Sequence, residues 1–186
     1  PFFVMNGDLL TNLDFEKMLD FHSKNEASRG GAGRNHQAQR SDSRLIQYNK
    51  QISAAGREHD LAKAERIFDS IFREGLSPNA FNYTSLMNVA IKCRNTQRAF
   101  QLFDTMIAAH IQPTAVTYNT LMNAAIQNGN SQLAFNLFDA MTATGIQPTA
   151  VTYTTLMNAA IQTSNNERAF QLFDAMAAAG IQPNAV

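Results

Sequence analysis

The sequence predicts an all-α fold, a right-handed superhelical solenoid of stacked helix-turn-helix repeats. Prolines recur every 35 residues, tyrosines follow the same period, and each period contains two amphipathic patterns with helical spacing. The prolines are Pro78, Pro113, Pro148 and Pro183, and the tyrosines are Tyr48, Tyr83, Tyr118 and Tyr153. A single helical hairpin cannot bury both of its faces, so we expect neighbouring hairpins to stack.

Residues 1–44 do not share the repeat. The apolar spacing of residues 11–23 predicts a short amphipathic helix, and the polar, Gly-rich residues 25–43 predict a flexible linker. The chain begins with Pro1 and lacks the basic stretch of a secretory signal, so we expect a processed or truncated N-terminus.

Four repeats follow this segment. Their boundaries are predicted at 45–79, 80–114, 115–149 and 150–184, and residues 185–186 begin a truncated fifth repeat. An array interrupted there would leave an apolar face uncovered, so we expect these repeats to belong to a longer array.

Each repeat is predicted to contain two helices, from about Leu45 to Gly180. In the third repeat the first helix places Tyr118, Leu121, Met122 and Ala125 on one apolar stripe. The second helix is predicted to start near Ser131 as its N-cap, and its core residues are Ala134, Phe135, Leu137, Phe138 and Met141. Gly145 is predicted to end this helix in the left-handed conformation, with His110 in the same place one repeat earlier.

The composition excludes several classes of protein. Fifteen Lys and Arg balance fifteen Asp and Glu, so the strongly basic surface of many nucleic-acid-binding proteins is absent. Cys93 is the only cysteine, and the four histidines share no ligand spacing with it, so we expect neither metal nor cofactor. The apolar runs are too short for a transmembrane segment. We expect no enzyme and no small-molecule substrate.

The repeats closely resemble the pentatricopeptide repeat (PPR) family, plain 35-residue class. The resemblance rests on Ala115-Val-Thr-Tyr-Asn-Thr-Leu-Met, Ala134-Phe-Asn-Leu-Phe-Asp-Ala-Met141 and Gly145-Ile-Gln-Pro-Thr149. Tetratricopeptide repeats have a period of 34 residues and a Trp-containing first helix, whereas this chain has no Trp. The resemblance implies a helical solenoid in a mitochondrion or chloroplast. It also implies sequence-specific binding of single-stranded RNA in organelle RNA processing, stability or translation.

The resemblance also implies RNA-contacting positions in each repeat, with two or three side chains reading each base. The base-reading pairs would be Asn49 with Asn79, Thr84 with Thr114, Asn119 with Thr149, and Thr154 with Asn184. The residues that lie between successive bases would be Ile46, Phe81, Val116 and Val151. The phosphate-contacting residues would be Arg57 and Lys92, whose place is taken by Gln127 and Gln162 in the last two repeats.

The family's code favours cytosine or uracil at Asn49 with Asn79, and adenine at Thr154 with Asn184. The two pairs closed by Thr depart from the common code. Two alternatives stay open. The Thr and Asn residues could serve only as helix caps. The neutral charge and the Gln replacements also fit a scaffold subunit that binds proteins in a large organellar complex such as a ribosome or membrane assembly. No deaminase motif (His-x-Glu with Cys-x-x-Cys) is present.

Overall fold

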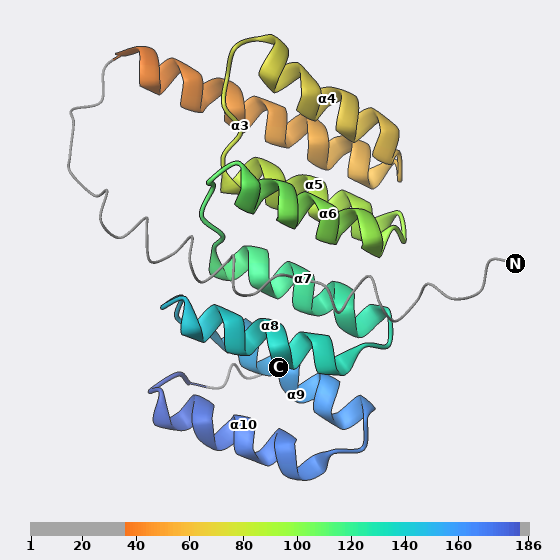
Figure 1. Ribbon diagram of the computed structural model, residues 1–186, viewed down its shortest axis with the longest axis vertical. Coiled ribbons are helices and arrows are strands. Elements are labelled where there is room, and N and C mark those ends of the chain that lie inside the picture. Colours follow the sequence, from red (N-terminus) through yellow and green to blue (C-terminus); the bar gives the residue numbers. More distant parts are fainter. Residues whose placement is uncertain (1–35, 183–186) are drawn as a thin grey trace, which may run out of the picture. The chain divides into compact units, whose positions relative to one another are not determined.

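The computed structural model describes residues 36–182, and within this range it contains eight α-helices and no strand (Figure 1). The helices are α3 (His36–Arg57), α4 (Leu61–Arg73), α5 (Ala80–Lys92), α6 (Thr96–Ala108), α7 (Ala115–Gln127), α8 (Ser131–Ala143), α9 (Ala150–Gln162) and α10 (Asn166–Ala178). This confirms the predicted fold class, an all-α solenoid of helical repeats. The expected helix at 11–23 lies outside the described residues.

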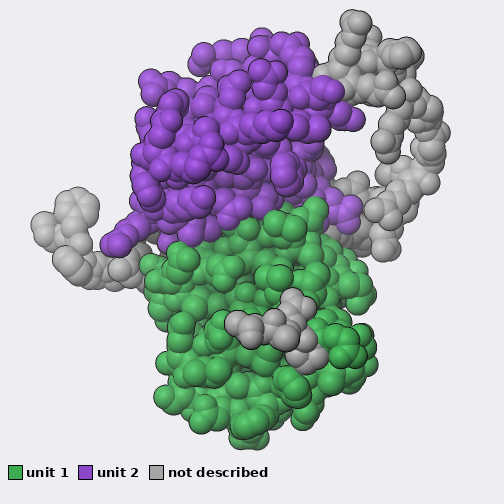
Figure 2. All heavy atoms as spheres, turned by 180° about the vertical axis from the view of Figure 1, so that it is seen from behind, with its two compact units in different colours: residues 1–15, 114–186 green, residues 16–113 purple. Residues whose placement is uncertain are grey.

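The helices form two compact units, shown in different colours in Figure 2. One unit contains α3–α6 and the other contains α7–α10, with the division between Pro113 and Thr114. In the first unit, α3 packs on α4 and on α5, and α5 packs on α6. In the second unit, α7 packs on α8 and on α9, and α9 packs on α10. Each unit is therefore two stacked helical hairpins in which first helix contacts first helix.

The first helix begins earlier than the sequence predicted. Residues 36–43 belong to α3, whereas the sequence pattern predicted linker up to residue 43. The last glycine before α3 is Gly33, and the stretch from His36 to Arg44 contains neither Gly nor Pro. The helix therefore extends N-terminally from its packed part without meeting a helix-breaking residue.

The second helices begin at asparagine or aspartate N-caps. The caps are Asp60, Asn95, Asn130 and Asn165, and each side chain accepts a hydrogen bond from the backbone N–H three residues later. The prediction of Ser131 as a cap is wrong by one residue, because Asn130 occupies the cap and Ser131 is the first helical residue. Ser131 is itself buried, so the hydroxyl residue at this place lies within the packed helix.

The helices end in a recurrent Schellman turn. After α8, the N–H of Gly145 donates to the carbonyl of Thr142 (3.0 Å), and the N–H of Ile146 donates to that of Met141 (3.1 Å). Gly145 has a φ of 74° and His110 a φ of 57°, which confirms the predicted left-handed ends. The turns between the two helices of a hairpin also contain left-handed residues: His59, Arg94, Gly129 and Ser164.

The core follows the predicted stripes with one exception. The first-helix stripe of the third repeat, from Tyr118 to Ala125, is fully buried. On α8, Phe135 and Leu137 are buried, but Phe138 is only half-buried. Its ring lies edge-on to Tyr153 at a centroid distance of 5.8 Å. Phe138 is therefore only partly buried, whereas the sequence pattern predicted a core residue.

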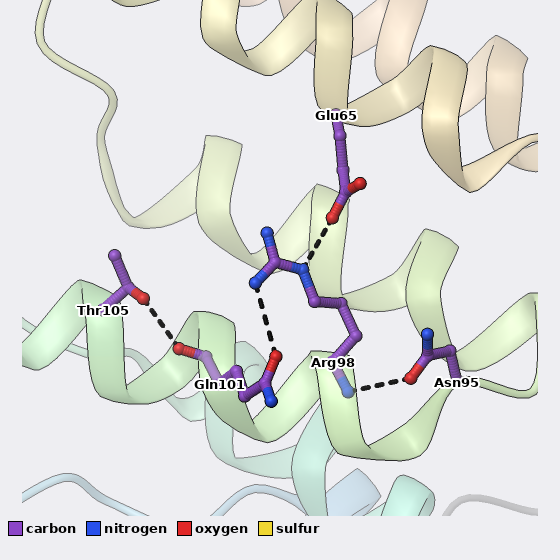
Figure 3. Close-up of polar contacts among 5 residues, drawn as sticks. All are labelled: Glu65, Asn95, Arg98, Gln101 and Thr105. Atoms are coloured by element: carbon purple, nitrogen blue, oxygen red, sulfur yellow. Dashed lines mark hydrogen bonds and ion pairs between the residues drawn. The ribbon is translucent and has the colours of Figure 1, made fainter.

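Second helices of neighbouring hairpins also contact each other through polar groups. In the α3–α6 unit, Nε of Arg98 on α6 donates to Oε1 of Glu65 on α4 at 2.6 Å (Figure 3). The backbone N–H of the same Arg98 donates to the capping Asn95 at 3.0 Å. Arg98 therefore joins the start of α6 to the preceding hairpin.

Candidate nucleic-acid interface

Four exposed apolar side chains recur in the first helices, each two residues before a tyrosine. Their exposed fractions are 54% for Ile46, 63% for Phe81, 58% for Val116 and 55% for Val151. Tyr83, Tyr118 and Tyr153 are buried, whereas Tyr48 is half-buried. Burial raises the pKa of Tyr83 and that of Tyr118, the latter to about 12. Three of the four tyrosines therefore belong to the core, and the apolar residues two positions before each tyrosine lie on the surface.

A chain of three asparagines lies beside this surface in the α3–α6 unit. Asn79 caps α5: its Oδ1 accepts from the N–H groups of Phe81 (3.0 Å) and Asn82 (3.1 Å). Oδ1 of Asn82 accepts from the N–H of Asn79 at 2.9 Å, which completes a capping box. Nδ2 of Asn82 then donates to Oδ1 of the buried Asn49 on α3 at 2.7 Å.

The backbone determines how each of these amides is oriented. Oδ1 of Asn79 faces two N–H donors, and Nδ2 of Asn82 also donates to the carbonyl of Leu45 at 3.2 Å. Oδ1 of Asn49 must in turn face Nδ2 of Asn82. Among the described residues nothing accepts from the Nδ2 groups of Asn49 and Asn79, so both keep donors for a ligand.

The α7–α10 unit has the same arrangement with threonines. Thr149 caps α9, and its Oγ1 accepts from the N–H of Thr152 at 3.4 Å. The N–H of Thr149 donates to Oγ1 of Thr152 at 3.0 Å. Oγ1 of Thr152 donates to Oδ1 of Asn119 on α7 at 2.8 Å.

The protons of these two hydroxyls can be counted. Thr152 has one hydroxyl proton, which it gives to Asn119. With that proton committed, the 3.2 Å contact between the hydroxyls of Thr149 and Thr152 can only use the proton of Thr149. While it makes this contact, Thr149 has no donor for a ligand, whereas among the described residues nothing accepts from the NH2 group of Asn79 at the same place. The cap residues of the two units differ chemically although their backbones are alike.

The other predicted base-reading residues are placed as follows. Thr114 caps α7 and accepts from the N–H of Thr117 at 3.3 Å. Thr84 is buried, and its Oγ1 donates to the carbonyl of Ala80 at 2.7 Å. Thr154 is exposed on α9, and Asn184 lies outside the described residues. Asn79, Thr114 and Thr149 thus all serve as helix caps, as the alternative interpretation expected, and all are also exposed.

The predicted phosphate-contacting residues occupy equivalent places. Arg57 and Lys92 are the last residues of α3 and α5, and Gln127 and Gln162 are the last residues of α7 and α9. All four side chains are exposed. The α3–α6 unit therefore offers two cations at the end of its first helices, and the α7–α10 unit offers two neutral amides.

Sequence reasoning missed the residues that link the caps to the preceding hairpin. These are Asn82 and Thr152, each three residues after a cap and 33 residues after its partner Asn49 or Asn119. One sequence signal was available: an amide or hydroxyl residue directly precedes each tyrosine, although the tyrosine itself is core. Within the described residues no group of three or more His, Cys, Asp or Glu could hold a metal ion, and no helix is long and apolar enough to cross a membrane.

The stacked hairpins, their 35-residue period and the exposed row in the first helices define a helical-repeat protein. Residues 34–185 match the family model described as the pentacotripeptide-repeat region of PRORP. The chain belongs to the pentatricopeptide repeat family. No curated protein matches it significantly.

Solved structures of repeat proteins are similar to this chain. The maize pentatricopeptide repeat protein PPR10 is 30% identical over 75% of this chain, with a TM-score of 0.64. PPR10 in complex with an 18-nt psaJ RNA element is 28% identical over 87% of this chain, with a TM-score of 0.67. This chain spans only 20% and 22% of those two chains.

A third structure is similar in fold alone. It is the PPR domain of Arabidopsis thaliana protein-only RNase P 1 in complex with tRNA, 17% identical, with a TM-score of 0.61. The match covers 90% of this chain and 84% of that domain.

Proposed function

We propose that this chain binds single-stranded RNA in a sequence-specific manner, as part of RNA processing, stability or translation in an organelle. The observation that carries the proposal is the row of exposed apolar side chains, Ile46, Phe81, Val116 and Val151, at one position of every repeat. Each of these side chains lies within about one helical turn of a predicted base-reading residue.

The chemistry of single-stranded RNA fits this row. Unpaired bases expose apolar faces that stack on protein side chains, and stacking on an aromatic side chain contributes about 1–3 kcal/mol per base. Single exposed apolar residues are common, but their recurrence at the same repeat position favours a ligand with repeated flat groups.

The polar groups beside the row supply base selection at one repeat. Nδ2 of Asn79 is a donor and suits a ring nitrogen that accepts, which the pairing edge offers in cytosine and adenine but not in uracil or guanine. Together with the pyrimidine preference that the family resemblance implies for Asn49, this favours cytosine opposite Asn49 and Asn79. We infer that the repeat closed by Thr149 discriminates weakly, because its cap has no donor left.

Relatives support the proposal. PPR10 has been solved with an RNA element bound, and this chain is 28% identical to it. We propose a binding role rather than a catalytic one for these repeats, and a chloroplast or mitochondrial location.

The experiment compares two exposed phenylalanines of the α3–α6 unit. Phe81 (63% exposed) lies in the row, and Phe72 on α4 (53% exposed) does not. With single-stranded RNA measured by fluorescence anisotropy, Phe81→Ser should weaken binding about 5- to 150-fold, the equivalent of about 1–3 kcal/mol. Phe72→Ser is the matched control and should leave the affinity unchanged.

The opposite pattern contradicts the proposal. If Phe72→Ser disrupts a purified complex with proteins while neither variant alters RNA affinity, the scaffold function is correct instead. Duplex RNA of the same sequence should bind much more weakly than the single strand, because its bases are already stacked.

A further inference from the structure

We propose that Asn82 and Thr152 are positioning residues that set the base specificity of the repeat preceding their own. Asn82 on α5 holds Asn49 on α3, and Thr152 on α9 holds Asn119 on α7. Each pair is 33 residues apart and lies within one compact unit. The proposal rests on the RNA binding proposed above, and it adds a residue of the following repeat to those assigned to base reading.

The protein uses every polar atom of the Asn82 side chain, which is fully buried. Its Oδ1 accepts from the backbone N–H of Asn79 at 2.9 Å. Its Nδ2 donates to the carbonyl of Leu45 at 3.2 Å and to Oδ1 of Asn49 at 2.7 Å. A turned amide would place its NH2 group against the N–H of Asn79 and its oxygen against the carbonyl of Leu45. The backbone therefore fixes Asn82 as a donor to Asn49.

Asn49 is consequently presented to a ligand as a donor. Its Oδ1 faces Asn82, so its Nδ2 is the group that is left. The side chain of Asn49 is 5% exposed, and no described residue accepts from this Nδ2. A buried NH2 group without an acceptor is unfavourable, so it favours a ligand that supplies one. In residues 36–182 the NH2 group of Asn79, which closes the same repeat, also has no acceptor.

Two donors side by side select one base by its chemistry. On the pairing edge of cytosine, the ring nitrogen N3 and the carbonyl oxygen O2 are neighbouring acceptors. Uracil has an N–H at the same ring position, guanine has an N–H and an amino group, and adenine has one acceptor beside an amino group. By holding Asn49 as a donor next to the donor of Asn79, Asn82 makes this repeat selective for cytosine over uracil.

Thr152 holds its partner less strictly, because a hydroxyl group can donate or accept. In the structure, its Oγ1 accepts from the N–H of Thr149 at 3.0 Å and donates to Oδ1 of Asn119 at 2.8 Å. If the amide of Asn119 turned, its Nδ2 would donate to the same Oγ1. The hydroxyl of Thr152 would then rotate to donate to that of Thr149, 3.2 Å away. Asn119 can therefore offer a donor to cytosine or an acceptor to uracil.

The test exchanges the two positioning residues. Asparagine and threonine both complete a capping box at this place, so Asn82→Thr and Thr152→Asn keep the helix starts. Fluorescence anisotropy would give the affinities for single-stranded RNAs that carry cytosine or uracil at each position in turn. Asn82→Thr should lower the cytosine-to-uracil affinity ratio at one position by about 2- to 12-fold, the equivalent of one hydrogen bond. Thr152→Asn should raise the ratio by a similar factor at another position.

The affinity ratio separates positioning from a loss of folded protein. Partial unfolding weakens the binding of both RNAs alike and leaves their ratio unchanged. Asn49→Ala is the second control, because it removes the amide that Asn82 holds. In a chain carrying Asn49→Ala, Asn82→Thr should have no further effect on the ratio.

The outcomes distinguish this inference from the proposed function. If the parent chain binds no single-stranded RNA, the proposed function fails and the inference fails with it. If the parent prefers cytosine at one position and Asn82→Thr keeps the parent ratio, the inference alone is overturned. The same holds if Asn82→Thr lowers the ratio equally with and without Asn49, or if the parent binds RNA without preferring cytosine at any position.

Discussion

At the scale of single residues, the most informative comparison is between Asn79 and Thr149. Both cap a first helix, and both accept from the backbone N–H three residues later. Within residues 36–182 nothing accepts from the NH2 group of Asn79, whereas the hydroxyl proton of Thr149 is the one available for its contact with Thr152. A residue can therefore be a helix cap and a base reader at once, but only if its side chain has a polar atom that the cap does not use.

Thr149→Asn should add base selection to the third repeat. Because Asn is as good an N-cap as Thr, the free energy of unfolding should change by less than about 0.5 kcal/mol. The new donor should favour cytosine over uracil at the facing base by about 2- to 12-fold, the value of one hydrogen bond of about 0.5–1.5 kcal/mol. RNAs differing at that base alone would provide the measurement. Thr149→Ser, which keeps the cap without a spare donor, should leave the preference unchanged, and an equal gain in both variants would contradict the proton count.

Tyr118 makes stability sensitive to alkaline pH. Burial raises the pKa of Tyr118 from 10.0 to about 12, so the folded chain keeps this proton where the unfolded chain loses it. The free energy of unfolding should therefore fall between pH 10 and 12, by up to about 2–3 kcal/mol from this group. Tyr118→Phe lacks the proton, so the stability difference between parent and variant should be constant from pH 7 to 9 and shift in favour of the variant above pH 10. Denaturant titrations across this range that show a constant difference would contradict it.

At the scale of helices, the ends are determined by local chemistry. The left-handed turn residue is a glycine in some hairpins and Ser164 or Arg94 in others, at φ values of 57° and 58°. Gly129, at 74°, occupies the same place as Ser164, and a Cβ added to it would meet nothing within 4 Å. A Cβ at position 129 would therefore bring only the cost of the backbone conformation.

Two single substitutions, Ser164→Gly and Gly129→Ser, should change the free energy of unfolding in opposite directions. Ser164→Gly relieves a left-handed non-glycine residue and should raise the free energy of unfolding by about 0.5–1 kcal/mol. Gly129→Ser should lower it by a similar amount. Thermal denaturation of both variants checks the prediction, and two changes of the same sign would show that side-chain contacts rather than φ determine these turns.

Local signals made the helices predictable. The period, the left-handed Gly145 and the inward stripe from Tyr118 to Ala125 follow from residues close in sequence, and the structure confirms them. The half-burial of Phe138 was not predictable from periodicity, because it depends on the position of Tyr153 on the next hairpin. The same holds for the link from Thr152 to Asn119, which joins residues 33 positions apart. The contacts of the base-reading residues themselves remain a prediction.

At the scale of the whole molecule, a net charge of zero hides a difference between the two units. The first helices of the α3–α6 unit end in Arg57 and Lys92, and those of the α7–α10 unit end in Gln127 and Gln162. Each cation that contacts a phosphate of a single strand contributes about 0.7 to the slope of log affinity against log salt. The salt dependence should therefore come mainly from the α3–α6 unit.

Charge exchange at these four positions should change the slope in steps. Arg57→Gln and Lys92→Gln should each reduce its magnitude by about 0.7, for every RNA sequence alike. Gln127→Lys and Gln162→Lys should each increase it by about 0.7. Binding measured across a salt series provides the slopes, and variants that change affinity for one sequence but not the slope would place these residues away from the phosphates.

The proton count at Thr149 has a consequence for how an RNA target would evolve. A nucleotide facing Asn49 and Asn79 would be held by selection, because substituting it removes a hydrogen bond to the free amide. A nucleotide facing Asn119 and Thr149 would be under weaker selection, since the cap there has no spare donor while it contacts Thr152. Related target sites should therefore keep some letters and vary at others. The variable letters would lie opposite threonine caps, so the protein would tolerate changes in its transcript without compensating changes of its own.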